Sequence, residues 1–522
     1  MFHSSVESPG ATDYPASISP AEARFDRWRR SCGAVLTPVV FVVTWWQLTG
    51  SLTPQGRTLA AVLTAVATLW VTEALPLPVT SLLGVVLCIV LGVADAKTVL
   101  APLADPIVFL FIGSFMLAHA MTLHRLDRRI ALSFLSLRWI GGHPLRVLAG
   151  LGLVTAMMSM WVSNTATTAM MLPVALGVIR TLERMRGDQD LARGQPWPFA
   201  SSVLLMIAYA ASIGGVGTPV GSPPNLICIG LIGALAQVEI SFFKWMALAV
   251  PMLVIMCPVL YLLLQVAQRQ STLQPGGHHD LQQYLRDERA ALGSWSPGQI
   301  NTLLAFLLAI ALWLLPGVLS VALKPDHPWR ALSDSRLPES VVALVAAILL
   351  FMLPVNWRER KFTLTWEEAV KIDWGTILLF GGGLSLGTLM FKTGVAEALG
   401  HAVADRLGAQ SLWTITATSI ALGIVISETT SNTAAANMII PVAIALAQAA
   451  GVSPVPPALG ACFGASFGFM LPVSTPPNAI VYSSRLVPIT KMIKTGIAFD
   501  ILGFFIVLGS LRVLCPLLGL SE

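Results

Sequence analysis

The amino-acid sequence predicts an all-α polytopic membrane protein built from two inverted-topology repeats, and three observations lead to this. Of the 522 residues, 55% are hydrophobic and only 11% are charged, with a mean hydropathy of +0.75. A soluble protein of this size could not keep so much apolar surface from water. A short polar sequence occurs twice, each time in the middle of a long apolar stretch. The basic residues that follow these two stretches are distributed differently, which indicates opposite orientations.

The internal repeat is the feature that says most about the architecture. Ser163-Asn164-Thr165 and Ser431-Asn432-Thr433 lie 268 residues apart, from position 163 to position 431. Further pairs repeat at this offset, namely Asp105 and Asp373, Gly113 and Gly381, and Pro173 and Pro441. In a membrane chain, a repeat with one polar triplet in each half is typical of a transporter whose site both halves build.

The first part of the chain reads as a polar tail followed by scaffold helices. Residues 1–32 are predicted to be a cytoplasmic tail, because arginines precede the first apolar run and the chain continues straight into further spans instead of ending a signal peptide. Scaffold helices are predicted within 33–140, at about 33–50, 57–73, 79–95 and 106–122.

The first half of a transport domain is predicted over residues 141–266. The stretch 147–179 carries no charge, and one helix of that length would be about 50 Å long, against a hydrocarbon core of about 30 Å. A re-entrant hairpin with the polar triplet at its tip fits better, provided that protein or water surrounds the tip. A broken helix at 199–238 and a helix at 241–266 follow, and then a cytoplasmic linker at 267–298.

The second half repeats this plan with the opposite orientation. Scaffold helices are predicted within 299–407, at about 300–316, 340–354 and 373–391, and the rest of the transport domain within 408–522, with a hairpin at 410–447 and a broken helix at 457–484. The connection after the first hairpin holds Arg180, Arg184, Arg186 and Arg193, whereas 448–457 has no Lys or Arg. The positive-inside rule therefore predicts hairpins that enter from opposite sides, a cytoplasmic N-terminus and an extracytoplasmic C-terminus.

Each hairpin is followed by a second break that ends in Pro-Pro-Asn, at 223–225 and at 476–478. Two consecutive prolines remove two backbone donors and force a helix to unwind. One copy alone would indicate no more than a kinked helix, but two copies that each follow a Ser-Asn-Thr predict a paired binding site. Freed carbonyls and Ser, Thr and Asn oxygens suit Na+, while helix N-termini suit an anion. Because the tips contain no Lys or Arg, cation coupling is physically natural.

Several of these stretches resemble the divalent anion:sodium symporter (DASS) family, which includes di- and tricarboxylate carriers. The stretches are residues 159–165 (SMWVSNT), 221–225 (GSPPN), 431–433 (SNT), 469–478 (FMLPVSTPPN) and 72–76 (TEALP). The resemblance covers nearly the whole chain after residue 33. It implies about 11 transmembrane helices plus two re-entrant hairpins, an elevator-type movement of the hairpin-bearing domain and a homodimer.

The resemblance also implies specific ligands. One Na+ would be bound by Ser159, Ser163, Asn164 and Gly221. A second Na+ would be bound by Ser427, Thr430, Asn432 and Ser474. The carboxylates of the substrate would meet Asn164, Thr165, Ser222, Asn432, Thr433, Thr475 and Pro476. Ser474 stands where alanine is also seen in the family, which leaves the number of coupled ions open.

A few other polar or potentially reactive residues lie within or beside the apolar segments. Glu428 is the one charge within the second hairpin, and an acid at membrane depth is either functional or a hydrogen-bonded carboxyl that fixes the hairpin. His119 and His124 have no metal-binding partners in the sequence and are predicted to lie at a membrane boundary. The six cysteines have no metal-ligand spacing and read as small hydrophobic residues.

The predicted function is sodium-coupled uptake of C4-dicarboxylates (succinate, malate or fumarate) across the cytoplasmic membrane by alternating access, with no catalytic residues and no nucleic-acid partner. A sodium-independent dicarboxylate exchanger and a citrate, sulfate or phosphate carrier are the alternatives. An intramembrane enzyme would need a nucleophile–base pair or a metal motif in the spans, and none is present in the sequence. A channel would not need two separate pairs of broken helices.

Overall fold

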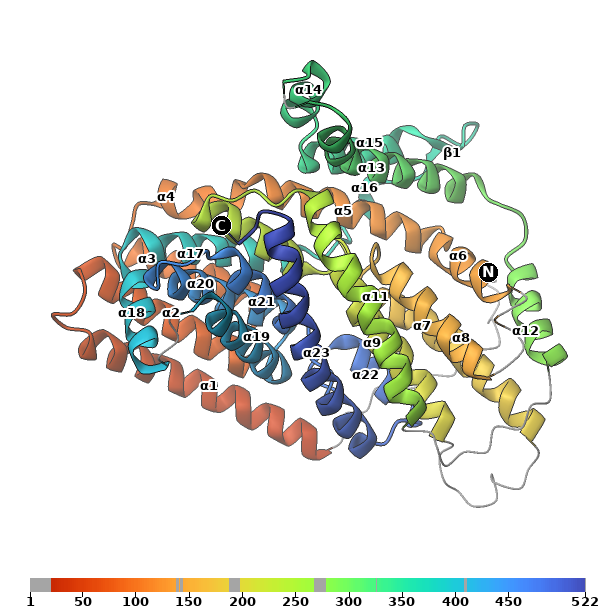
Figure 1. Ribbon diagram of the computed structural model, residues 1–522, viewed down its shortest axis with the longest axis horizontal. Coiled ribbons are helices and arrows are strands. Elements are labelled where there is room, and N and C mark those ends of the chain that lie inside the picture. Colours follow the sequence, from red (N-terminus) through yellow and green to blue (C-terminus); the bar gives the residue numbers. More distant parts are fainter. Residues whose placement is uncertain are drawn as a thin grey trace, which may run out of the picture.

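The computed structural model describes residues 20–137, 140, 144–186, 198–266, 278–324, 326–407 and 411–521, and within these ranges it is an assembly of packed helices with one small β-hairpin (Figure 1). Nine helices in the described ranges are long and apolar enough to cross a membrane by length and composition, and several shorter apolar helices accompany them. The predicted all-helical, multi-pass architecture is therefore confirmed at this level. Residues 1–19 of the predicted tail and the connections 187–197 and 267–277 lie outside the described residues.

The first half of the chain forms the following helices: α1 (Pro20–Gln47), α2 (Pro54–Thr72), α3 (Leu77–Val90), α4 (Ala96–Leu100), α5 (Pro106–Leu123), α6 (Leu126–Leu135), α7 (Pro144–Ser159), α8 (Asn164–Arg186), α9 (Pro198–Val216), α10 (Pro223–Leu231) and α11 (Phe242–Val266). A short 3-10 turn (Ala101–Ala104) precedes α5, and a π-helical turn (Ile232–Ala236) follows α10. The amphipathic helix α12 (His278–Ala290) lies in the predicted linker.

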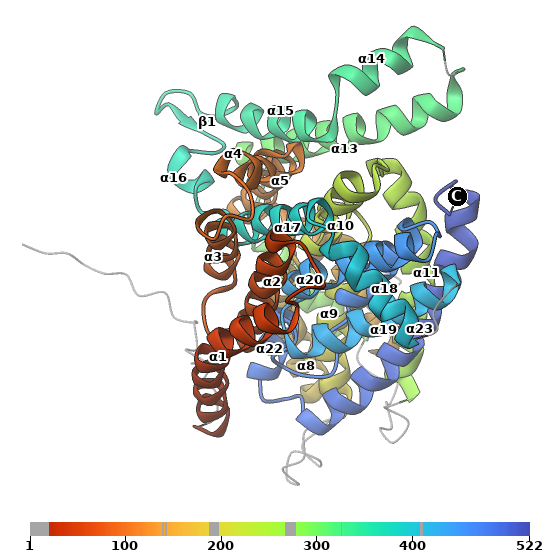
Figure 2. The ribbon, with the colours of Figure 1, turned by 90° about the vertical axis from the view of Figure 1, so that its left-hand side faces the viewer.

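The second half forms α13 (Pro297–Ala322), α14 (Pro328–Arg336), α15 (Glu339–Met352), α16 (Trp366–Ala369), α17 (Trp374–Lys392), α18 (Val395–Leu407), α19 (Leu412–Thr429), α20 (Asn432–Ala449), α21 (Val455–Ala465), α22 (Pro476–Ser483) and α23 (Ile489–Leu517). Strands β1 (Pro354–Asn356) and β2 (Lys361–Phe362) pair antiparallel between α15 and α16. Figures 1 and 2 both show α13, α14 and α15 along one edge of the molecule, with α14 projecting from it.

The two halves of the chain are interleaved. Helix α5 of the first half packs against α15 of the second, and α17 packs against α3. The same exchange occurs next to the hairpins, where α10 contacts α20 and α22 contacts α8. Helix α9 is buried along its whole length. Because each of the four helix pairs named above joins the two halves, neither half can form the hairpin region alone.

The starts of α5 and α17 show how the repeat is encoded locally. Asp105 and Asp373 are the N-caps, and their carboxylates accept hydrogen bonds from the backbone N–H groups of Ile107 (2.9 Å) and Thr376 (3.1 Å). An aspartate at this position satisfies an N–H that lacks a partner within the helix and favours the positive end of the helix dipole. The repeated aspartates are therefore helix caps.

Some elements differ from the sequence-based expectation. Helix α1 begins at Pro20, inside the predicted tail 1–32, so a charged and solvent-accessible first segment continues into the apolar one without a break. Helices α6, α14, α16 and α18 were not expected, because they are short and amphipathic or polar and lack the length of a span. Buried Arg129 of α6 donates to the backbone oxygens of residues 292–294 and so fixes α6 to the end of the linker.

Candidate functional site

The first polar triplet forms the turn of a helical hairpin between α7 and α8. The hydroxyl of Ser159, the last residue of α7, donates to Oδ1 of Asn164, the first residue of α8, at 2.8 Å. The backbone N–H of Ala166 donates to the hydroxyl of Ser163 at 3.3 Å, so Ser163 caps the start of α8. The side chain of Asn164 is thereby held at the point where the positive end of α8 faces the turn.

The second triplet forms the same turn between α19 and α20. The hydroxyl of Ser427 donates to Oδ1 of Asn432 at 2.8 Å, and Ser431 caps α20 by accepting from the N–H of Ala434 at 3.2 Å. The position of each partner is shifted by the same 268 residues as the triplet itself. Both turns therefore place an asparagine side chain and a serine hydroxyl in one shared arrangement.

The two Pro-Pro-Asn breaks are also held in the same way. The Nδ2 of Asn225 donates to the carbonyl oxygens of Gly215 and Thr218, both at 2.7 Å. The Nδ2 of Asn478 donates to those of Gly468 (2.8 Å) and Leu471 (3.0 Å). Each asparagine closes the unwound loop that joins two half-helices, and Oδ1 of Asn225 and of Asn478 is buried without a hydrogen-bond partner in the described residues.

Glycines in the breaks allow hairpin and broken helix to approach closely. A Cβ on Gly215 would lie 2.2 Å from Oδ1 of Asn164, and a Cβ on Gly221 would lie 2.7, 2.8 and 3.0 Å from the carbonyl oxygens of Gly215, Met160 and Ser159. Gly468 occupies the matching place opposite Asn432, where a Cβ would be 3.4 Å from Oδ1. Three backbone carbonyl oxygens thus crowd around Gly221, while Asn164 Oδ1 lies against Gly215. Neutral oxygens of this kind are the ligands that a small hard cation takes.

The second half departs from the first at one pair of positions. Where the first half has Met160 and Gly221, the second has Glu428 and Ser474. The buried Glu428 carboxylate accepts hydrogen bonds from the Ser474 hydroxyl at 2.5 Å and from the N–H of Met470 at 2.9 Å. The carboxyl therefore ties the end of α19 to the break before α22, which is the structural role that the sequence left open for it.

A second acid lies beside Glu428. Asp500 of α23 is 5% exposed and sits next to the Glu428 carboxyl, and neither of its oxygens has a hydrogen-bond donor in the described residues. The hydroxyl of Tyr209 donates to the carbonyl oxygens of Phe469 (2.7 Å) and Met492 (3.2 Å) close by. Sequence reasoning missed Asp500 of α23 and Tyr209 of α9, because neither residue belongs to a repeated motif and only packing brings them to the second turn.

The remaining predicted residues lie at helix starts. Ser222 and Thr475 are the N-caps of α10 and α22, and both are almost fully buried. Pro476 is the first residue of α22, directly after Thr475. Thr165 is exposed on the first turn of α8 and Thr433 is partly exposed on that of α20. Four helices that begin at the turns and breaks present their positive ends to this region.

One predicted ligand bridges to another part of the molecule. The hydroxyl of Thr430, which is 3% exposed, donates to the backbone oxygen of Trp70 in α2 at 3.2 Å. The second turn therefore contacts the predicted scaffold directly, while the first turn has Val162 at the matching position. The lone pairs of the Thr430 hydroxyl and its backbone carbonyl stay available as oxygen ligands.

The two histidines lie away from the turns. Nε2 of His119 is 3.3 Å from the Glu368 carboxylate, and Nε2 of His124 is 2.7 Å from the carbonyl oxygen of Thr363. The Lys371 ammonium and the His119 ring hold the pKa of the partly exposed Glu368 carboxyl below its usual range. In the described part of the chain, no three His, Cys, Asp or Glu side chains are grouped so that they could hold a metal ion.

Comparisons with known proteins agree with this arrangement. Residues 29–520 match the family model described as the sodium:sulfate symporter transmembrane region. The chain is 33% identical over 488 residues to the sodium-dependent dicarboxylate transporter SdcS of Staphylococcus saprophyticus, covering 93% of this chain and 91% of that protein. It is 32% identical over 480 residues to the SdcS of Staphylococcus aureus strain USA300, covering 91% of this chain and 89% of that protein. It is also 33% identical to an uncharacterized transporter of Haemophilus influenzae, covering 86% of this chain and 89% of that protein.

A solved structure shares the fold at low sequence identity. The crystal structure of the Alcanivorax borkumensis YdaH transporter superposes with a TM-score of 0.53 at 13% identity, covering 82% of this chain and 89% of that one. The family match extends over nearly the whole chain and confirms the resemblance that the paired motifs indicated. With its duplicated polar turns inside a multi-pass helical fold, the chain belongs to the sodium:sulfate symporter (divalent anion:sodium symporter) family and is a membrane transporter, not an enzyme.

Proposed function

We propose that this chain carries C4-dicarboxylates such as succinate, malate and fumarate across the cytoplasmic membrane, coupled to Na+. The observation that carries the proposal is the pair of equivalent turns, in which Ser159 and Asn164, and Ser427 and Asn432, form the same 2.8 Å hydrogen bond. Relatives named sodium-dependent dicarboxylate transporters, at 32–33% identity over most of the chain, support the choice of ion and substrate.

The oxygen atoms at each turn fit a Na+ site. In the first half we assign Ser159, Ser163, Asn164 and Gly221, where the hydroxyl and amide oxygens are joined by the carbonyls that crowd Gly221. In the second half we assign Ser427, Thr430, Asn432 and Ser474. All these ligands are neutral, so a bound Na+ keeps its positive charge for an anion beside it. Na+ is here a transported coupling ion.

The substrate carboxylates are assigned to the helix starts next to the two ions. The residues are Asn164, Thr165, Ser222, Asn432, Thr433, Thr475 and Pro476. Neither hairpin (147–179 and 410–447) contains a Lys or Arg, so the carboxylates meet only helix N-termini, hydroxyls and amides. A helix terminus is worth about 0.3–1 kcal/mol at exposed sites and about 2 kcal/mol when partly buried.

Those contributions do not offset the desolvation of the substrate. Removing a carboxylate from water costs several kcal/mol per ion even after relaxation, and a dicarboxylate has two. Bound Na+ supplies the missing positive charge, and the coupling must then be reciprocal: succinate affinity rises with Na+ and Na+ affinity rises with succinate.

We further propose how the substrate crosses. The helices α7–α11 and α19–α23 form a transport domain that moves as an elevator against a scaffold of α1–α5, α13, α15 and α17, in inverted-topology repeats with two re-entrant hairpins, as a homodimer. The N-terminus is cytoplasmic and the C-terminus extracytoplasmic. Single cysteines at Arg180 and Gln448, in a background without the native cysteines, should then react with an impermeant thiol reagent from opposite faces. Reaction of both from one face contradicts the inverted repeat.

The test of function is uptake by purified protein in proteoliposomes. We expect an inward Na+ gradient to drive accumulation of labelled succinate and choline to support none. Unlabelled malate and fumarate should compete, whereas citrate and sulfate should not. Equal uptake in choline supports the sodium-independent exchanger instead. Competition by sulfate alone favours a sulfate carrier. This alternative is supported by the description of the matching family, the sodium:sulfate symporters.

A further inference from the structure

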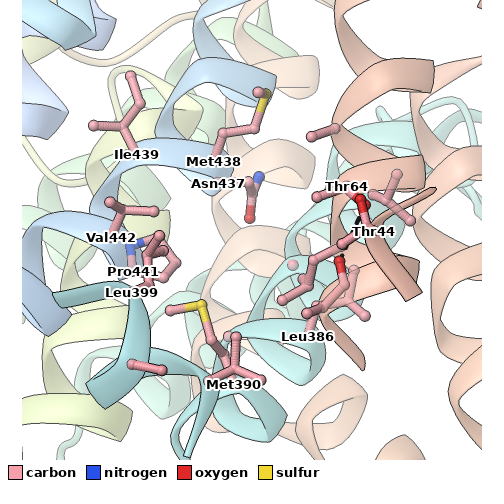
Figure 3. A pocket seen from close by; sticks show the side chains of 18 of the residues that line it. Thr44, Thr64, Leu386, Met390, Leu399, Asn437, Met438, Ile439, Pro441 and Val442 are labelled. Carbon is pink, nitrogen blue, oxygen red and sulfur yellow. Dashed lines mark hydrogen bonds between the residues drawn. The ribbon is translucent and has the colours of Figure 1, made fainter. Parts of the chain in front are cut away.

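A half-open apolar cavity of about 650 Å³ lies between α1 and α2 on one side and α17, α18 and α20 on the other. Its size is within the range of roughly 300–1,000 Å³ that small-molecule sites occupy. Figure 3 shows Thr44 and Thr64 of α1 and α2 facing Met438, Pro441 and Val442 of α20, with Met390 of α17 and Leu399 of α18 beside them. The proposed substrate residues do not line it, so the cavity is separate from the ion and substrate sites.

The cavity exists because α17 carries glycines where the other repeat carries rings. Gly383 and Gly387 line it, and the 268-residue offset carries them onto Phe115 and His119 of α5. Those two large side chains are partly buried beside α5, Phe115 against the core and His119 against Glu368. The symmetry of the two turns therefore does not require this space.

The walls offer few partners to water. The single hydroxyl hydrogen of Thr64 is shared among Thr44 (3.2 Å) and the carbonyl oxygens of Ala60 and Ala61. Among the described lining residues, Asn437 Oδ1 is the one buried side-chain oxygen without a hydrogen-bond partner. A buried water needs two to four polar partners, and the rest of the wall is almost wholly hydrocarbon.

The opening faces apolar side chains. Leu422 of α19 lines the cavity with 43% of its surface exposed, and its neighbour Val425 is 62% exposed. In a chain that spans a membrane, such a surface meets the acyl chains of the bilayer. Acyl chains of the surrounding lipid are therefore the molecules that can enter the cavity.

One end of the cavity has the features of a membrane boundary. Leu48, Ser51 and Leu52 line it there, at the connection between α1 and α2. Arg57, one turn before the lining residue Ala60, places its guanidinium 3.9 Å from the ring centroid of Trp45. Tryptophan and arginine together mark the headgroup level of a bilayer, and a guanidinium is a good phosphate ligand.

We propose that this cavity binds one acyl chain of a membrane phospholipid, with the phosphate held near Arg57 at the α1–α2 connection. The chain lies between α2 and α20. If α20 belongs to the moving domain, as the proposed function has it, the lipid occupies the gap between the moving and the static helices and affects the rate of that movement. The binding itself does not depend on the transport mechanism.

The test is photo-crosslinking of the full-length protein in nanodiscs with phosphatidylglycerol that carries a diazirine in its acyl chain. We expect mass spectrometry to find labelled peptides from α2, α18 and α20. Gly387→Phe fills the cavity, since a Cβ there would meet only side chains at 3.2 Å or more, and labelling of these peptides should fall by about fivefold or more. Gly509→Phe is the matched control, because nothing lies within 4 Å of a Cβ on that exposed glycine of α23.

Two further variants keep the test decisive. Ala67→Phe fills the same space from α2 and serves if Gly387→Phe does not give a monodisperse protein. Arg57→Gln should lower the amount of phosphatidylglycerol that co-purifies, and an unchanged amount contradicts the headgroup position. Unchanged labelling in a monodisperse filled variant, or equal labelling of α23, overturns the proposal. Labelling is measured without Na+ or substrate, so a failed uptake assay and a failed lipid assay are told apart.

Discussion

The two hairpin turns share their neutral hydrogen bonds but differ in charge. Both join a serine at the end of one helix to an asparagine at the start of the next at 2.8 Å. Only the second adds a buried carboxylate, which binds Ser474 and the backbone of Met470. The first turn has Met160 there, and it crowds carbonyl oxygens around Gly221. The shared part is what the proposed two-fold site for ions and substrate needs, and the unshared part implies that the two proposed cation sites need not be equivalent.

The shared asparagines give the largest expected effect. Asn164→Ala and Asn432→Ala should each lower succinate uptake by about 100-fold or more, because each amide loses contacts to both a cation and a carboxylate, at about 1.5–3 kcal/mol apiece. Asn356→Ala, at the last residue of β1, is the matched control, since the Asn356 side chain accepts hydrogen bonds only from the backbone N–H groups of residues 358 and 359. If either variant is monodisperse and its succinate uptake stays within a few-fold of wild type, the corresponding Ser-Asn-Thr triplet only caps a helix and binds neither ion nor substrate.

The second-largest effect is expected at Gly221 and Ser474, which occupy matching positions in the two breaks. Gly221→Ala puts a methyl group within 3.0 Å of three carbonyl oxygens, and the resulting strain of about 1–3 kcal/mol should lower Na+ affinity by roughly tenfold or more. Ser474→Gly gives the second turn the residue of the first and should cost only a few-fold. Sodium titration of succinate uptake measures both. Equal losses in the two variants would mean that the crowding at Gly221 has no role in the site.

The acid pair should affect stability in opposite directions. Glu428→Ala leaves the Met470 N–H and the buried Ser474 hydroxyl without their acceptor, so the protein should be destabilised by about 1–3 kcal/mol. Asp500→Asn supplies a donor to the Glu428 carboxylate and removes a neighbouring acid, so it should raise the thermal midpoint. Thermal unfolding in detergent compares them. A lower midpoint for Asp500→Asn would contradict the view that the Asp500 carboxyl lacks a hydrogen-bond donor.

The smallest effect is expected for a surface ion pair that joins α6 to α12. Arg128 of α6 pairs with Glu288 of α12 at 2.8 Å, with both side chains about one-third exposed. A double-mutant cycle of Arg128→Ala and Glu288→Ala should give a coupling of about 0.2–1 kcal/mol, and uptake should stay near wild type. A large loss of uptake would show that the α6–α12 contact belongs to the transport cycle.

The sequence by itself determined the elements whose signals are local. The polar turns and the Pro-Pro-Asn breaks follow from rules that act within a few residues, so they could be predicted from the chain alone, whereas the start of α1 at Pro20 could not. The repeat offset also led to the right pairs, including Asp105 and Asp373, which cap their helices alike. The family followed from the same motifs and is confirmed over residues 29–520.

Only the tertiary structure decided which distant groups meet. Thr430 reaches the carbonyl oxygen of Trp70, 360 positions earlier, and Asp500 reaches Glu428 from a helix without any motif. The apolar cavity lies where α1 and α2 face α17, α18 and α20, and two glycines of α17 line it. Such contacts depend on how helices far apart in the chain pack against one another, because side-chain periodicity fixes the face of a helix but not the identity of its neighbour.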